Sequence, residues 1–487
     1  MIHINMKPFI LLITGALSIF ASPILAQFNI VESHEADALI NKTTKCSSFG
    51  LNGNSYFVLK NTEGFNEKYS LISVSADGNN INNIPLVIDG GTLYNMNSVT
   101  GIDRVGKTAF VAIENRNKNE GKNTFIIRTL SDKGALGAEK KEVGFIPYTK
   151  MLDPGTWLYY VTNDKQHVAV VAIYPAVKGE PQLGKFYFLD NAFDVITTAD
   201  LNIPATEKKK NYFFSLLASD KGDVYLVNNE YEKSTYKIPV VYSKLANQNT
   251  FTENTVLLKE PYRVFDYTAS ITETGSLLLG GYIQEKRGSI SFGSTSIKGV
   301  WFYNSDKPTE TNIMDFDKSI SNVKILALLN NGNTAFLVGE QAIEKKEPRP
   351  AGYMGFDENY FYEYNDIVVT GYNVPNNTKF DIQLPRKMAG RNFLADLAPS
   401  VGIVNEKLCI LYNDDLKKFV ESSYSYKVPV TVLINNDGLM EQPIHYAKQF
   451  NTGNTGYNVL CNFAFFKSNQ FTTLSLSGKY VKGAIFK

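Results

Sequence analysis

The clearest pattern along the chain is a pair of apolar runs joined by a short polar turn. It stands out in residues 323–338, where the two runs meet at Asn330-Asn331-Gly332-Asn333. A tight hairpin needs positive φ angles, which Gly adopts freely and Asn tolerates, so this stretch predicts a β-hairpin. The pattern recurs roughly every 50 to 75 residues, as a repeat architecture requires.

Eight such turns occur, and an apolar run follows each of them, at residues 51–54, 104–107, 163–166, 219–222, 273–276, 330–333, 404–407 and 467–470. A second hairpin follows each of the first seven, with turns such as Asn436-Asp437-Gly438. One repeat is therefore a sheet of four antiparallel strands, A to D. The A–B and C–D connections are tight, and the B–C and D–A connections lie at the other end of the strands.

Many of the predicted strands are apolar at successive positions, as in residues 168–173 and 325–329. Both faces of such a strand must be buried, which happens when blades stack face to face, whereas a two-sheet sandwich shows alternation. The sequence thus predicts an all-β β-propeller of four-stranded antiparallel blades, with eight blades favoured and seven the alternative. The last repeat lacks an outer strand, which residues 28–31 are predicted to supply, so N- and C-terminal strands close the ring.

Residues 1–26 have the pattern of a secretory signal peptide. Lys7 provides the positive start, residues 9–20 the apolar centre, and Ile24-Leu25-Ala26 a small-residue cleavage site. No later segment is apolar and long enough to predict a membrane-spanning helix. We therefore expect residues 27–487 to form a single propeller domain, exported to the periplasm or the extracellular space, with no integral membrane segment after the signal is removed.

Composition narrows the function classes. Without Lys7, the 49 basic residues become 48, which equals the number of acidic residues, so the expected mature chain has no net formal charge and is a poor candidate for binding nucleic acid. The sequence contains no P-loop, zinc-protease, calcium-loop or serine-hydrolase motif, so we predict no cofactor, no metal and no assigned catalytic residue. Cys46, Cys409 and Cys461 are interpreted as free thiols, although ring closure leaves a Cys46–Cys461 disulfide open.

The B–C connections are longer than the tight turns, so the face that carries them is the predicted binding face. The longest spans residues 341–364 and is rich in aromatic residues, from which we select Tyr353, Phe356, Tyr360 and Tyr362. Aromatic rings on a loop can stack on sugars or anchor a protein partner. The alternative, which we favour for these rings individually, is that they pack the loop against its neighbours.

A second candidate cluster lies in the D–A connections, near the mouth of the central channel. Arg263 and Asp266 precede one strand A and Arg391 and Asp396 precede another, in similar Arg-x-x-Asp-type stretches. Asp153 precedes a third strand A. Carboxylates at a channel mouth can serve acid–base chemistry on a polysaccharide, whereas the favoured alternative is Arg–Asp pairing between blades.

The repeated four-stranded pattern resembles that of β-propeller proteins in general, without the WD or kelch signatures. The Asn-, Lys- and Tyr-rich composition together with the signal resembles exported proteins of Bacteroidetes-type bacteria, many of unknown function. We therefore expect an exported protein that binds a protein or glycan partner on the B–C face without catalysis. A glycoside hydrolase or lyase with carboxylates at the channel mouth is the alternative, and a structural role in an envelope assembly is a third.

Overall fold

The structure is a computed structural model, and it describes residues 28–40, 44–63, 66–88, 91–92, 95–148, 153–177, 179–204, 214–228, 237–259, 261–285, 296–308, 311–346, 360–373, 376, 378–391, 398–415, 418, 427–446, 458–477 and 479–487. The predicted signal peptide lies outside these residues. Within them, every regular element longer than a single turn is a β-strand, and no helix is long and apolar enough to cross a membrane.

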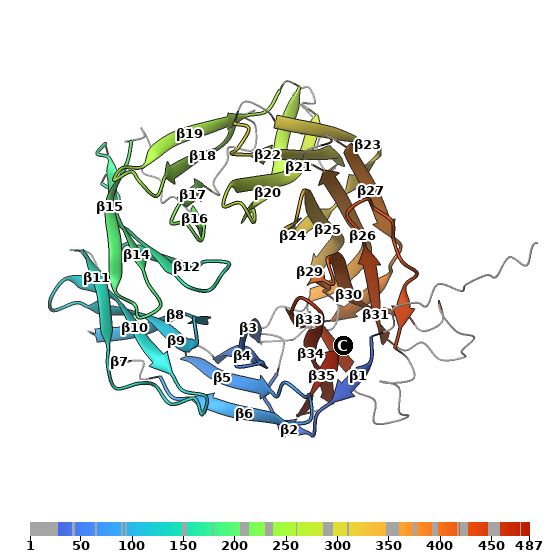
Figure 1. Cartoon of the computed structure of the whole chain (residues 1–487), viewed down its shortest axis with the longest axis horizontal. Helices are drawn as coiled ribbons and strands as arrows, with labels where there is room; N and C mark the ends of the chain where they lie inside the picture. The colour runs from blue at the N-terminus through green and yellow to red at the C-terminus, as the bar shows by residue number, and fades with distance from the viewer. Residues whose placement is uncertain are drawn as a thin grey trace, which may run out of the picture.

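The strands form eight antiparallel sheets arranged as blades around a central axis (Figure 1). Blades 1 to 4 each hold four consecutive strands: β3 (Lys45–Leu51), β4 (Asn54–Glu63), β5 (Asn66–Val74) and β6 (Ile81–Leu86); β8 (Asn95–Val105), β9 (Thr108–Asn117), β10 (Lys122–Leu130) and β11 (Lys141–Pro147); β12 (Thr156–Val161), β13 (Val168–Ile173), β14 (Gln182–Leu189) and β15 (Val195–Ile203); and β16 (Phe214–Ala218), β17 (Val224–Asn228), β18 (Lys237–Lys244) and β19 (Thr252–Leu257). The two-residue strand β7 (Gly91–Thr92) extends blade 2 along β8.

Blades 5 to 8 continue the same order: β20 (Tyr262–Ile271), β21 (Leu277–Glu285), β22 (Ser296–Asn304) and β23 (Thr311–Ser321); β24 (Val323–Asn331), β25 (Thr334–Lys346), β26 (Tyr360–Asn373) and β27 (Thr378–Leu384), with β28 (Met388–Arg391) beside β26; β29 (Ser400–Val404), β30 (Lys407–Asp415), β31 (Lys427–Ile434) and β32 (Ile444–His445); and β33 (Asn458–Phe466), β34 (Phe471–Ser477) and β35 (Tyr480–Phe486). In each blade the first strand is innermost, and each innermost strand contacts those of both neighbouring blades, so the ring is closed. The protein is an eight-bladed propeller, as the sequence predicts, and the seven-bladed alternative is wrong.

The outer strand of blade 8 comes from the N-terminus. β1 (Ile30–Glu32) pairs antiparallel with β35, and β2 (Ala36–Asp37) pairs with the other end of β35. Phe28 is buried, with its ring 5.3 Å from that of Phe471. The predicted closure is confirmed, and it removes the open edge that β35 would otherwise present.

The hydrophobic core is divided into one cluster at each interface between adjacent blades. β13 shows why its residues are apolar at every position. Val168, Val170 and Ala172 pack into the cluster shared with blade 2, while Ala169 and Val171 pack into the cluster shared with blade 4. Because a strand presents alternate side chains to opposite faces, a strand buried on both faces has no polar positions. The three cysteines form no disulfide with one another, and Cys409 and Cys461 are buried between blades 7 and 8.

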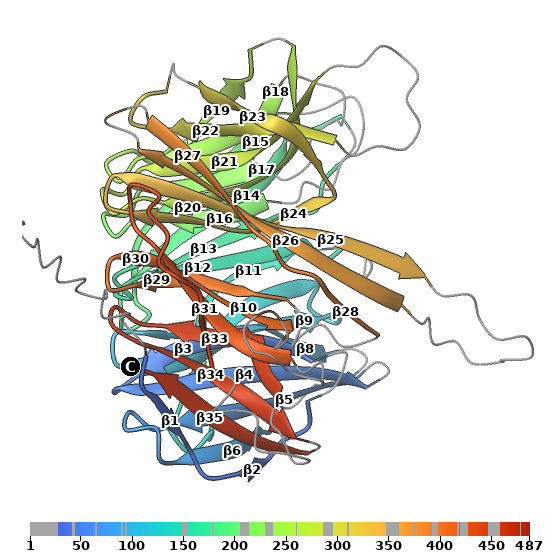
Figure 2. The ribbon, with the colours of Figure 1, turned by 90° about the vertical axis from the view of Figure 1, so that its right-hand side faces the viewer.

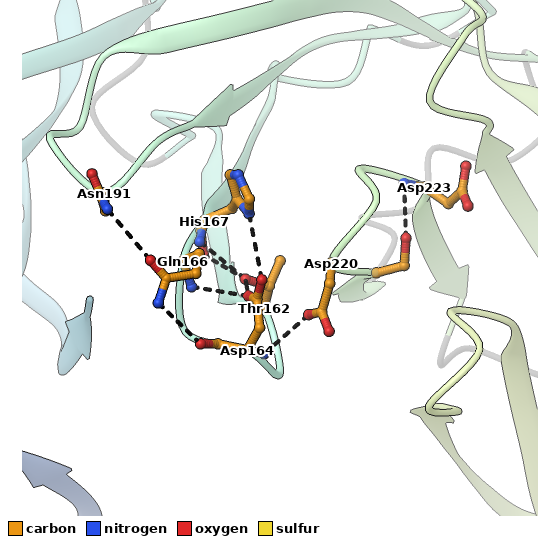
Figure 3. Close-up of polar contacts among 8 residues, drawn as sticks. Thr162, Asp164, Gln166, His167, Asn191, Asp220 and Asp223 are labelled. Carbon is orange, nitrogen blue, oxygen red and sulfur yellow. Dashed lines mark hydrogen bonds and ion pairs between the residues drawn. The ribbon is translucent and has the colours of Figure 1, made fainter.

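The two faces of the disc differ. The A–B and C–D turns form the turn face, and the B–C and D–A connections form the loop face. Five turns share one geometry, in which the first side chain accepts the backbone N–H of the fifth residue and the fourth residue has positive φ: 131–135, 190–194, 219–223, 272–276 and 435–439. Neighbouring turns are also joined to each other. Figure 3 shows the backbone N–H of Asp164 donating to Asp220 of the next blade at 3.0 Å.

Candidate functional site

Several B–C connections on the loop face are extensions of strands instead of irregular loops. In blade 1, residues 61–63 and 66–68, expected as parts of a loop, pair with each other in β4 and β5. In blade 6, β25 and β26 continue past the disc as a long hairpin, which Figure 2 shows projecting from one side of the molecule. A paired hairpin holds its side chains more rigidly than a free loop, because its backbone hydrogen bonds are satisfied within the hairpin.

This hairpin carries a third strand. β28 pairs with β26, so that Arg391 lies opposite Phe361 and Met388 opposite Tyr364. We call residues 342–346, 360–364 and 388–391 the wing. Tyr362 lies in the wing, half-buried and stacked on Tyr364 with ring centroids 6.3 Å apart.

A buried ion pair lies at the base of the wing. Glu340 Oε1 is 2.5 Å from Arg386 Nη2, and both side chains are almost completely buried. The guanidinium also lies 5.7 Å from the ring of Tyr364 and 6.0 Å from that of Tyr412 in blade 7. Burial raises the pKa of Glu340 to about 7, although the charge of Arg386 acts in the opposite direction. The pair and the two rings join blade 6 to blade 7.

Arg263 and Asp266 lie in the innermost strand β20, near the central axis, rather than in the connection before it. A β-bulge between Val264 and Asp266 interrupts the pairing with β21. The carboxylate of Asp266 accepts the backbone N–H of Tyr267 at 2.9 Å. Burial raises the pKa of Asp266, and the charge of Lys324 on the neighbouring innermost strand lowers it. The cation that acts on Asp266 is therefore Lys324, which belongs to the next blade.

The loop face also holds a cavity of about 450 Å³ between blades 2 and 3. One wall is the β9–β10 connection with Glu120 and Gly121, and another is the β13–β14 connection, lined by Tyr174 and Leu183 among others. Tyr148 and Asp153, from the connection between the blades, complete it. Apolar side chains reach the solvent here, since Leu183 is 52% exposed.

Backbone hydrogen bonds hold the cavity walls in place. The N–H of Tyr148 donates to Gly121 O, and the N–H of Tyr174 donates to Leu183 O, both at 2.9 Å. Gly121 has a φ of 62°, and a Cβ there would lie 2.9 Å from the carbonyl oxygen of Tyr148. A side chain at this position would push the two walls apart, so the close approach depends on glycine.

The structure places the predicted site residues in three different settings. Asp153 lines the cavity between blades 2 and 3, Arg263 and Asp266 lie near the axis in blade 5, and Tyr362 lies in the wing. The backbones of Tyr360 and Arg391 belong to β26 and β28, whereas Tyr353, Phe356 and Asp396 lie outside the described residues. The expected likeness between the Arg263 and Arg391 stretches is wrong, because Arg263 lies in an innermost strand and Arg391 in a wing strand.

Tyr148, Tyr174, Glu120 and Glu180 line this cavity but are not among the site residues predicted from the sequence. A signal for them was present, since Pro147-Tyr148 and Tyr174-Pro175 occur in connections of adjacent blades on the same face. Within the described part of the chain, no three His, Cys, Asp or Glu side chains are grouped so as to hold a metal ion. The cavity chemistry is thus that of tyrosine rings, proline and leucine side chains and carboxylates.

No family model matches the chain, and no curated protein matches it. Among solved structures, the β-propeller domain of the Trilobed protease from Pyrococcus furiosus is similar at 11% identity and a TM-score of 0.37, over 83% of this chain and 96% of that one.

Two further solved structures are similar at the same level. A member of the DUF4221 family from Bacteroides vulgatus has 9% identity and a TM-score of 0.33, over 95% of this chain and 99% of that one. The polysaccharide lyase Uly1 has 10% identity and a TM-score of 0.37, over 93% of this chain and 91% of that one. At these identities the likeness concerns the propeller fold alone, and fold does not imply function.

Proposed function

We propose that the protein is an exported, non-enzymatic binding protein whose loop face holds a glycan in the cavity between blades 2 and 3. The observation that supports this most directly is the composition of that cavity. Tyr148 and Tyr174 lie in it together with Asp153, Glu120 and Glu180, on connections that come from two blades. A rigid scaffold that presents side chains from several connections on one face is a common arrangement for binding.

The chemistry of the lining suits a sugar. A pyranose ring has an apolar face, which tyrosine rings and exposed aliphatic groups cover, and hydroxyl groups, which donate hydrogen bonds to carboxylates. Hydrogen bonds to a charged acceptor are stronger than those between neutral groups. The carboxylates on Asp153, Glu120 and Glu180 also disfavour an anionic ligand, so we expect a neutral oligosaccharide.

The test is binding of the purified 27–487 chain to a glycan array, followed by titration calorimetry with the best neutral oligosaccharide. Tyr174→Ala removes a ring and Asp153→Asn removes a charged acceptor. We expect each to weaken binding about tenfold, because a hydrogen bond to a charged group or a buried contact of this kind is worth ~1.5 kcal/mol or more.

The matched control is Tyr480→Ala. Tyr480 is an exposed tyrosine at the β34–β35 turn, on the loop face of blade 8 and outside the cavity. Its replacement should leave affinity unchanged. If no neutral glycan binds, or if Tyr480→Ala weakens binding as much as Tyr174→Ala, the proposal is wrong and a protein partner becomes the better hypothesis.

The second candidate is an enzyme that acts on a polysaccharide. It is favoured by the presence of several carboxylates in one cavity, since such enzymes use a pair of carboxyl groups that flank the scissile bond. Incubation of the wild type with each bound glycan, followed by chromatography of the products, distinguishes the two functions. Product formation that is lost in Asp153→Asn or Asp266→Asn supports the enzyme.

Export rests on the sequence of residues 1–26. The predicted cleavage site makes Gln27 the first residue of the mature protein. N-terminal sequencing of protein recovered from the periplasm or the medium of an expressing bacterium tests this directly, and an intact Met1 would contradict it.

A further inference from the structure

Among the described residues, hydrogen bonds between neighbouring A–B turns form a ring on the turn face, with one junction left out. Seven of the eight junctions between neighbouring A–B turns have a direct bond: Gly106 N–H to Lys165 O, Asp164 N–H to Asp220, Lys221 Nζ to Thr274 O, Gly332 N–H to Glu273, Asn331 Nδ2 to Glu406 O, Asn405 N–H to Ser468 O and Lys467 Nζ to Gly53 O. Among the described residues, no hydrogen bond joins the A–B turns of blades 1 and 2.

A cavity of about 280 Å³ lies at this gap. Its walls are the turns of blade 1 and blade 2 and the end of β33 in blade 8. Phe465 packs directly on the backbone of blade 1, since a Cβ at Gly50 would lie 2.8 Å from its ring. This contact brings the chain after β33, with Lys467, to the edge of the cavity.

Three cations line the cavity: Arg104, Lys107 and Lys467. None of the described residues that line it is acidic. The chain as a whole has almost equal numbers of basic and acidic residues, so the excess of positive charge at this cavity does not follow from the overall composition. The nearest acidic neighbour in sequence, Asp103, accepts the backbone N–H of Arg104 and lies 3.9 Å from Lys165, outside the cavity.

Arg104 and Lys467 each have hydrogen-bond donors left over after their contacts with backbone carbonyl groups. Arg104 Nη1 donates to Gly106 O at 3.0 Å, while its Nε is buried without a hydrogen-bond partner. Lys467 Nζ donates to Gly53 O at 2.7 Å, and an ammonium group has two further protons. Burial and the charge of Lys487 both lower the pKa of Lys467. Lys107, the third cation that lines the cavity, is exposed.

We infer that this cavity is a second binding site, for a small ligand that carries an oxyanion group, either a phosphate or a carboxylate. Charge-assisted hydrogen bonds from a guanidinium and ammonium groups are the usual means of recognising such groups. The site lies on the turn face, opposite the cavity of the proposed function, and does not depend on it.

Titration calorimetry at low salt tests the inference with three probes: inorganic phosphate, glucuronate as a carboxylate sugar, and glucose as a neutral sugar. We expect phosphate, glucuronate or both to bind and glucose not to bind. Whichever probe binds identifies the source of the oxyanion. Raising the salt concentration to physiological levels should weaken binding, because screening acts on exposed charges.

Lys107→Glu is the main variant, since Lys107 is exposed and its side chain makes no hydrogen bond or ion pair with another described residue. It should weaken binding about tenfold or more, because a hydrogen bond to a charged group is worth ~1.5–3 kcal/mol. Arg104→Gln removes the buried Nε–H and should act in the same direction. Lys133→Glu is the matched control, an exposed lysine in the C–D turn of the same blade and on the same face.

Two results would overturn the inference. The first is that neither phosphate nor glucuronate binds at low salt. The second is that Lys133→Glu weakens binding as much as Lys107→Glu, which would show that only overall charge matters. Unchanged melting temperatures for the two lysine variants confirm that the comparison is made between folded proteins.

Discussion

The ion pair between Glu340 and Arg386 offers a sharp test of how blades 6 and 7 are joined. Replacement of Arg386 by Met removes the cation and leaves the carboxylate of Glu340 in a buried site. Glu340 and Arg386 are 2% and 0% exposed, so water cannot replace the lost partner without a rearrangement. The variant also loses the contacts of the guanidinium with the rings of Tyr364 and Tyr412.

The expected cost follows from these contacts. Above pH 8, where Glu340 is ionised in the folded protein, removing its partner should cost ~3–5 kcal/mol, because the carboxylate must stay buried without a cation or bind a proton. The double variant Glu340→Gln, Arg386→Met should recover a large part of this loss, since no charge then remains buried. At acidic pH the cost of Arg386→Met alone should be smaller, because Glu340 protonates and a neutral carboxyl group is cheaper to bury.

Guanidinium chloride unfolding, followed by tryptophan fluorescence, measures these free energies. Trp157 and Trp301 are both buried, in blades 3 and 5, so their signals report unfolding without direct disturbance from the substitution. If the unfolding midpoint measured by fluorescence agrees with the midpoint measured by circular dichroism, the transition is cooperative. A double-mutant cycle then isolates the coupling between the two residues.

A loss of under ~1 kcal/mol in Arg386→Met, which is the range of exposed ion pairs, would contradict this role of the pair. A double variant whose loss of stability equals the sum of the two single losses would contradict it as well. Either result would mean that the pair is hydrated and does not hold the blades together.

Two further predictions follow from burial and from ring closure. Because burial holds the pKa of Glu340 at about 7, above its usual 4.5, the folded state binds a proton that the unfolded state has released. The stability from this group is complete below pH 4.5 and is lost as the pH rises through 7, so melting temperatures should fall over that range and should fall less in Glu340→Gln. Deletion of residues 1–32 removes β1 and exposes the edge of β35, so size-exclusion chromatography should show association and a lower melting temperature than for deletion of residues 1–27. A monomer of unchanged stability would contradict the role of β1 in closing the ring.

The fold was largely predictable because its signals are local. A turn such as 219–223 is specified by its own residues, since Ser219 accepts the N–H of Asp223 and Gly222 supplies the positive φ. The strands between turns are recognisable because burial on both faces leaves every position apolar, as in β13. The number of blades then follows from the number of repeated hairpins, and the short last repeat predicts an outer strand from the N-terminus.

The candidate sites were less predictable, because each depends on residues far apart in the chain. Asp153 was selected from the sequence, but the tyrosines beside it belong to connections that only the stacking of blades 2 and 3 brings together. Arg263 and Arg391 occur in similar stretches, yet one lies in an innermost strand and the other pairs with β26 in the wing. Sequence similarity between two connections does not specify where each strand begins.

The sequence by itself therefore determined the all-β class, the four-stranded repeat, the ring of eight blades and its closure, since hairpin turns and two-sided burial act over a few residues. Only the tertiary structure decided which connections become paired hairpins, where Glu340 meets Arg386, and where the turn of blade 1 fails to bond that of blade 2. Those outcomes depend on the packing of one blade on the next. The distances between side chains on different blades are set by that packing, and no single segment of the chain specifies them.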